Sequence, residues 1–95
     1  MIDQLLAPDK RRLFVGGEWS PASAGGEFPV TDPSTAEPFT AVADGTVADA
    51  LDAVSAAFDA LVVWSATAPR ERGEMLRRVF ELMIERRQQL ATLIT

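Results

Sequence analysis

An abrupt change in composition near residue 45 limits most strongly how this chain can fold. All but one of its six prolines and all but one of its six glycines lie before residue 46. Both residue types interrupt helices and mark turns. Residues 46–95, by contrast, contain only Pro69 and Gly73 and repeat apolar residues at helical spacing. We therefore expect turns and short strands over residues 1–45 and helices over residues 46–95.

The first predicted element is a β-hairpin in which Gly16 and Gly17 join Arg12–Val15 to Glu18–Ser20. Two consecutive glycines favour a type I′ turn, because both central positions adopt positive φ. A glycine pair can also cradle a phosphate, but that loop leads into a helix, and neither this pair nor Gly25–Gly26 precedes one. We interpret both pairs as turns.

A second hairpin is predicted to join Glu27–Thr31 to Phe39–Ala43. In the turn, Asp32 can accept a hydrogen bond from a backbone N–H two residues on, and Pro33 fixes its own φ. The two hairpins supply the apolar residues expected to pack together: Phe14, Val15, Trp19, Phe28, Val30, Phe39 and Val42.

Thr46 is predicted to cap a first helix that ends near Val63 or Trp64. Its hydroxyl can accept a hydrogen bond from the N–H of Asp49, and the aspartate suits the positive end of the helix. The helix has an apolar face and small side chains that let another element approach closely. The apolar face is Leu51, Val54, Phe58 and Leu61, and the small residues are Ala50, Ala53, Ala57 and Ala60.

A second helix is predicted to begin at Pro69, because the missing N–H of proline costs nothing at the first helical position. Its apolar stripe is followed by the wholly polar Arg86–Gln89, which indicates a kink or a short break. No helix-ending signal precedes Thr95, so we expect a helix interrupted in mid-course. The stripe comprises Leu76, Phe80 and Met83, with Val79 and Ile84 beside it and charged residues on the opposite face.

The composition excludes several classes of function. The chain has no cysteine and no histidine, so it has no disulfide, no thiol nucleophile and no imidazole for metal binding or proton transfer. A net charge of −5 argues against binding to nucleic acid. The longest apolar run, Ala60–Trp64, is too short to cross a bilayer, and residues 1–12 do not resemble a secretory signal. We expect a cytoplasmic protein that binds neither nucleic acid nor a membrane.

Three segments share one family resemblance. They are Leu13–Trp19 (LFVGGEW), Phe28–Thr35 (FPVTDPST) and Pro69–Arg78 (PRERGEMLRR), the last of which follows Trp64. In this order they resemble the opening hairpin, the N/D-P-x-T-G-E turn and the W…R…R…L helix start of the aldehyde dehydrogenase superfamily. The resemblance covers residues 13–95.

Two details add to the resemblance. The run Ala68–Glu85 is most similar to bacterial succinate-semialdehyde dehydrogenases. Ala36 departs from the family pattern, which usually has glycine there. If this position needs positive φ, alanine costs roughly 1 kcal/mol.

The resemblance implies an α/β family fold with a Rossmann-like cofactor domain, of which this chain covers the N-terminal β-hairpins and two to three α-helices. We divide the chain into an N-terminal tail (1–12), a β-hairpin segment (13–45) and an incomplete helical segment (46–95) that flanks the cofactor-binding domain. The family oxidises an aldehyde to a carboxylic acid with NAD or NADP, using a cysteine, a glutamate and an asparagine. All of these would lie beyond residue 95, so no catalytic, cofactor-binding or metal-binding residue is assigned and the chain alone is expected to be inactive.

The resemblance also implies partners. They are the remainder of the aldehyde dehydrogenase fold and, for the full-length family, further copies in a homo-oligomer. Some members bind a structural cation partly through backbone carbonyls at the stretch matching Val30 and Thr31, with a carboxylate ligand that would lie beyond Thr95. The alternative is a self-standing, non-catalytic α+β interaction module derived from the family, whose exposed helix face would be hidden in a defined oligomer.

Other conspicuous residues are interpreted as structural. The basic run Lys10–Arg12 is expected to be a solvated tail. Trp19 and Trp64 are expected to be packing anchors rather than ligand platforms. Three acidic residues of the first helix are expected to lack a converging partner: Asp49, Asp52 and Asp59.

Overall fold

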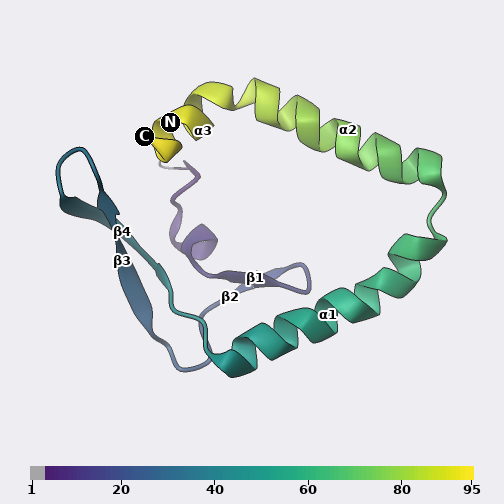
Figure 1. Cartoon of the computed structure of the whole chain (residues 1–95), viewed down its shortest axis with the longest axis horizontal. Coiled ribbons are helices and arrows are strands. Elements are labelled where there is room, and N and C mark those ends of the chain that lie inside the picture. Colours follow the sequence, from purple (N-terminus) through teal and green to yellow (C-terminus); the bar gives the residue numbers. More distant parts are fainter. Residues whose placement is uncertain (1–3) are drawn as a thin grey trace.

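The computed structural model describes residues 4–95 and places two β-hairpins ahead of three α-helices (Figure 1). This agrees with the predicted order of elements. A short 3₁₀ helix precedes the first hairpin. The elements are η2 (Pro8–Arg11), β1 (Leu13–Val15), β2 (Glu18–Ser20), β3 (Glu27–Asp32), β4 (Glu37–Ala43), α1 (Val47–Ala66), α2 (Pro69–Glu85) and α3 (Arg87–Ile94).

The β1–β2 hairpin closes through the predicted type of turn. Gly16 and Gly17 have φ values of 61° and 82°, which confirms that both positions need positive φ. Phe14 pairs with Trp19 across the antiparallel strands. Their ring centroids lie 4.7 Å apart with the planes tilted by 53°, so Trp19 packs within the hairpin as expected for a cross-strand aromatic pair.

The β3–β4 hairpin is longer than predicted, because both strands extend to the turn at Asp32 and Glu37. β4 therefore includes Pro38, and β3 includes Pro29. Among residues 4–95 each sheet has two strands, so each of these strands is an edge, where proline is tolerated. The register shifts between Val30 and Thr31.

The turn between β3 and β4 contains one strained residue. Ala36 has a φ of 62°, and its N–H donates a hydrogen bond of 2.8 Å to the carbonyl of Asp32. The carboxylate of Asp32 accepts bonds from the N–H (2.8 Å) and hydroxyl (2.6 Å) of Ser34, which confirms the predicted aspartate turn. The position that usually holds glycine in the family therefore does require positive φ.

The helices begin and break close to the predicted residues. α1 ends at Ala66, two residues later than expected, before the extended Thr67 (φ −71°, ψ 136°). α2 starts at Pro69, and Arg86 separates it from α3 with φ −102° and ψ 15°. The polar run therefore does contain a break. On the charged face of α2, Nε of Arg77 lies 3.4 Å from Oε1 of Glu81, in the expected i,i+4 arrangement.

The N-terminal basic run is not wholly solvated. η2 contacts β2 and β4, and a guanidinium nitrogen of Arg11 lies 3.5 Å from the hydroxyl of Thr40. Lys10 and Arg12 are exposed. The prediction of a solvated tail was therefore wrong for Arg11, because the short helical turn directs the chain back over the β3–β4 hairpin.

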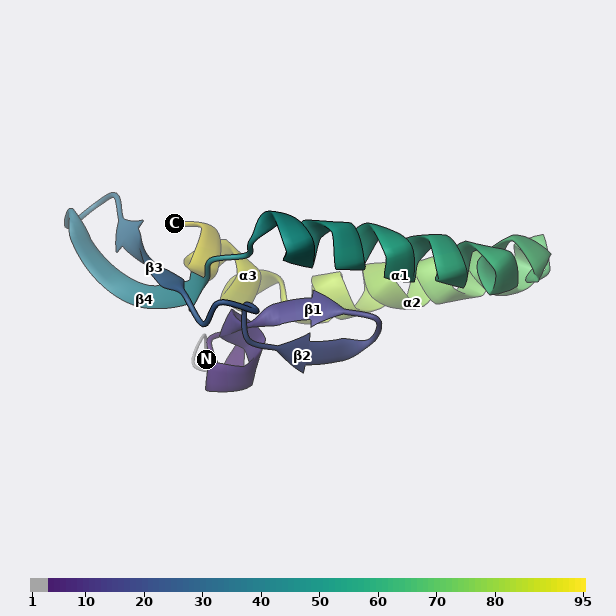
Figure 2. The same cartoon turned by 90° about the horizontal axis from the view of Figure 1, so that it is seen from below.

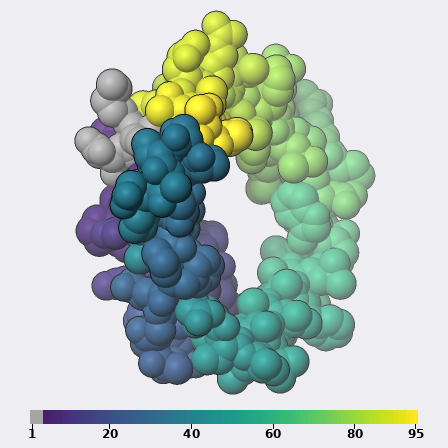
Figure 3. All heavy atoms as spheres, turned by 60° about the vertical axis from the view of Figure 1, so that its left-hand side comes forward, coloured from purple at the N-terminus to yellow at the C-terminus, as the bar shows by residue number. Residues whose placement is uncertain are grey.

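The elements follow one another in an open frame around an empty centre (Figure 1), and Figure 2 shows this frame from its edge. An opening passes through the space-filling view between strands and helices (Figure 3). The radius of gyration is 16.2 Å and the extents are 47 × 35 × 18 Å. A compact domain of this length would have a radius of gyration of about 12 Å. The expected apolar cluster is correspondingly open, since Phe14 is 59% exposed, and Ala22 is the one buried hydrophobic residue in the described range 4–95.

Candidate functional site

Within residues 4–95, no three or more acidic side chains lie close enough together to hold a metal ion. The same residues include no helix that is long and apolar enough to cross a membrane. The hydroxyl side chains have no histidine to activate them, because the sequence contains none. The structure does show a set of large apolar side chains exposed on the helices.

One exposed apolar face lies on α1. Leu51, Val54 and Phe58 are 65%, 66% and 70% exposed, and their spacing places them on one side of the helix. Removing a side chain of this size from water stabilises a fold or a complex by about 1.5–3 kcal/mol. Because these side chains remain exposed to water in this chain, the face is suited to packing against another folded segment or domain.

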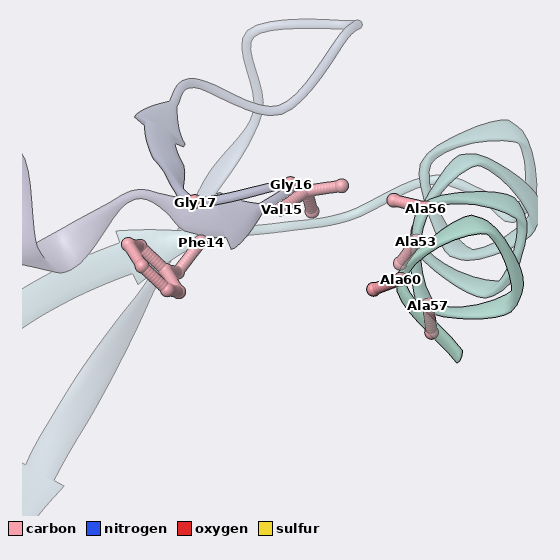
Figure 4. A pocket seen from close by; sticks show the side chains of 8 residues that line it. All are labelled: Phe14, Val15, Gly16, Gly17, Ala53, Ala56, Ala57 and Ala60. Carbon is pink, nitrogen blue, oxygen red and sulfur yellow. The ribbon is translucent and has the colours of Figure 1, made fainter. Parts of the chain in front are cut away.

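A second face of α1 consists of small side chains and lies beside the β1–β2 hairpin. A groove of about 470 Å³ separates Phe14–Gly17 from Ala53, Ala56, Ala57 and Ala60, and Figure 4 shows the alanines on the side of α1 nearest the hairpin. A β-carbon added to Gly16 would lie 3.9 Å from the β-carbon of Ala56. This confirms that the small residues let another element approach.

α2 continues the exposed apolar surface. Leu76, Phe80 and Met83 are 63%, 51% and 56% exposed. The guanidinium carbon of Arg77 lies 5.1 Å from the centre of the Phe80 ring, a cation–π geometry that leaves much of the ring uncovered. The apolar stripe predicted for this helix thus has no cover within the described part of the chain.

The end of α3 closes the frame against the β3–β4 hairpin. Thr92–Thr95 and residues of the hairpin, among them Val30, Thr31 and Phe39, line a cavity of about 320 Å³. Val30 and Thr31, which the resemblance associates with a cation in some family members, therefore lie beside the last helix. No acidic cluster forms there among the described residues.

Asp49 joins the start of α1 to the loop after β2. Thr46 and Asp49 form a reciprocal capping box, as predicted, with the Asp49 N–H donating to the Thr46 hydroxyl at 3.2 Å. The N–H of Ser23 also donates to both carboxylate oxygens, at 3.3 and 3.1 Å. The expectation that Asp49 lacks a converging partner was wrong, because nothing in the local sequence indicates a residue 26 positions away. Asp52 and Asp59 are exposed.

These hydrogen bonds hold the pKa of Asp49 below its usual value. The main cause is the backbone N–H of Thr46, followed by that of Ser23, and desolvation acts in the opposite direction. Hydrogen bonds of this kind stabilise the ionised form. Asp49 is therefore a carboxylate that connects two segments.

Comparison with known proteins assigns this arrangement to a family. The model of the aldehyde dehydrogenase family matches residues 19–95. The chain belongs to that family. It is 43% identical over 82 residues to the mitochondrial succinate-semialdehyde dehydrogenase of Pan paniscus, covering 86% of this chain and 15% of that enzyme. It is 40% identical over 86 residues to the glutarate-semialdehyde dehydrogenase of Pseudomonas putida, covering 90% of this chain and 18% of that enzyme.

The open frame also occurs within a complete aldehyde dehydrogenase. A crystal structure of a betaine aldehyde dehydrogenase point mutant from Staphylococcus aureus, in complex with NAD+, matches 98% of this chain with a TM-score of 0.89 and 29% identity. The match covers 19% of that chain. This aldehyde dehydrogenase segment thus spans less than a fifth of each of these relatives, and the predicted family, fold fragment and similarity to succinate-semialdehyde dehydrogenases are confirmed.

Proposed function

We propose that this chain is the N-terminal part of an NAD(P)-dependent aldehyde dehydrogenase that oxidises a semialdehyde, such as succinate semialdehyde, to a dicarboxylic acid. The observation that carries the proposal is the identity of about 40% to enzymes named for succinate and glutarate semialdehyde. Both compounds pair an aldehyde with a carboxylate. The NAD+ bound to the similar betaine aldehyde dehydrogenase supports a nicotinamide cofactor.

In this proposal the chain provides structure rather than reacting groups. It has no cysteine to form a thiohemiacetal with the aldehyde, so that step belongs to residues outside it and the 95 residues alone are inactive. Its partner is the remainder of the aldehyde dehydrogenase fold, which the apolar faces of α1 and α2 would contact beside the cofactor domain. The proposal extends to a cytoplasmic homo-oligomer.

A chimera tests the proposal with a complete enzyme. This chain replaces the matching segment of the Pseudomonas putida glutarate-semialdehyde dehydrogenase, and NAD(P)H formation is followed with glutarate and succinate semialdehydes. We expect an active chimera. Phe58→Asp, in the exposed face of α1, should abolish activity because it places a charge in a dry contact. Asp59→Asn, at the next position, is the matched control and should leave activity unchanged.

Two outcomes would contradict the proposal. One is a folded chimera that oxidises neither semialdehyde. The other is full activity of the chimera with Phe58→Asp, which would show that the α1 face contacts nothing in the enzyme. A sharp, concentration-dependent melt of the 95-residue chain alone would instead support the independent interaction module.

A further inference from the structure

The carboxylate of Asp49 ties the loop after β2 to the beginning of α1. One oxygen, Oδ2, accepts from the N–H of Thr46 at 2.9 Å and from the N–H of Ser23 at 3.1 Å. The other, Oδ1, accepts from the same Ser23 N–H at 3.3 Å. The hydroxyls of Ser23 and Thr46 are themselves hydrogen-bonded at 3.1 Å. Residues that are 23 and 26 positions apart in the sequence are thus held together by polar contacts.

The loop between the hairpins is fixed at both ends. Ser23 is held by Asp49, and the carbonyl of Gly26 accepts a hydrogen bond of 2.9 Å from the N–H of Asp44. Between β2 and Ser23 lies Ala22, which is only 4% exposed. β2 ends at Ser20, three residues before Ser23. The position of Ser23 therefore limits where the β1–β2 hairpin can lie relative to α1.

We propose that Asp49 is a positioning residue that holds the β1–β2 hairpin beside the alanine face of α1. The helix that carries Asp49 also carries Ala53 and Ala56, which line the groove opposite Gly16. One carboxylate therefore connects the two walls of the groove, which are the β1–β2 hairpin and the alanine face of α1. The inference concerns the geometry of this chain and is independent of the proposed oxidation of semialdehydes.

The contact suits a carboxylate better than an amide. Both Asp49 oxygens act as acceptors for backbone N–H groups. An asparagine has one acceptor oxygen, which can take the place of Oδ2, and a donor NH₂ group. That NH₂ group would take the place of Oδ1 and face the N–H of Ser23, so two donors would oppose each other and the contact with Ser23 would be weakened. The nearby carboxyls of Asp44 and Asp52 are exposed. Asp52, one position beyond Leu51, therefore offers a matched control for the same chemical change.

A distance measurement tests the role directly. The chain contains no cysteine, so Glu18→Cys in β2 and Asp59→Cys in α1 provide the only two sites for spin labels, both at exposed positions. We expect a narrow distribution of label separations in the otherwise unchanged chain. Adding Asp49→Asn should broaden or shift it, whereas Asp52→Asn should not. Ser23→Ala keeps the backbone donor and should also leave the distribution narrow.

The titration of the carboxyls provides a second measurement. NMR of the unlabelled chain should show Asp49 titrating below the usual pKa of an aspartate, and Ser23→Ala should largely preserve that lowering, because it keeps the backbone N–H. An Asp49 midpoint at the usual value for an aspartate would overturn the proposal, because the contact would then not form. A label distribution unaffected by Asp49→Asn, or altered equally by Asp52→Asn, would also overturn it. Neither measurement depends on aldehyde oxidation.

Discussion

Replacing Ala36 by glycine should stabilise the β3–β4 hairpin. Ala36 has a φ of 62°, and a β-carbon in this left-handed region costs about 1–2 kcal/mol. Glycine removes that cost, but it has more conformational entropy than alanine in the unfolded chain. This difference reduces the gain in stability by about 0.4–1 kcal/mol. The side chain of Ala36 is exposed, so no packing is lost, and its N–H keeps the 2.8 Å bond to Asp32. The expected net gain is about 0.8 kcal/mol, the difference between the midpoints of these two ranges.

Thermal and urea unfolding of the Ala36→Gly chain would measure the gain. A change of this size in a domain of this length raises Tm by roughly 2–8 °C. Ala24→Gly is the matched control, because Ala24 is also exposed in a turn and does not have positive φ. At Ala24 the substitution changes only the conformational entropy of the unfolded chain, so we expect the free energy of unfolding to fall by about 0.4–1 kcal/mol. If both substitutions lowered stability equally, the argument from backbone strain would be refuted.

Three further predictions concern single positions. Gly17→Ala should destabilise the chain by about 1 kcal/mol in urea unfolding, because φ is 82° and no atom within 4 Å would meet the added carbon. Thr46→Ala should lower stability by about 1 kcal/mol through loss of the cap, and far-UV circular dichroism would follow it; an unchanged midpoint would contradict the cap. The hydroxyl and N–H of Ser34 lower the pKa of Asp32 in the folded chain below its usual 3.8. Asp32 therefore stabilises the fold above that pH and ceases to do so as pH falls through the lower folded value. Ser34→Ala should reduce this acid dependence, and a stability–pH curve that it leaves unaltered would disprove the assignment.

Features specified by neighbouring residues could be predicted from the sequence. The turn at Gly16 and Gly17, the cap at Thr46 and the break at Arg86 each depend on backbone conformations or hydrogen bonds within a few positions. These local preferences hold regardless of what surrounds the segment. The family resemblance likewise singled out Ala36 as a departure from the usual glycine, and the structure shows that this position has positive φ.

Contacts between distant segments could not be predicted in the same way. The bond from Ser23 to Asp49 and the contact of Arg11 with Thr40 join residues 26 and 29 positions apart. Neither pair has a periodicity or a motif that links its members. The open frame also differed from the expected cluster of hairpin residues such as Phe14, because two-stranded sheets and single helices offer faces with no second layer behind them.

The open frame changes which substitutions the protein can tolerate. In an ordinary domain, exposed positions accept polar residues and buried positions do not. Here Phe58 is 70% exposed, and Ala22 alone is buried among the hydrophobic residues of the described range 4–95. If the remainder of an aldehyde dehydrogenase covers α1, then Phe58 becomes an interior residue only on assembly. Selection on the assembled enzyme would then keep the exposed faces of α1 and α2 apolar, as in a protein core, while exposed turn residues that do not have positive φ remain free to vary.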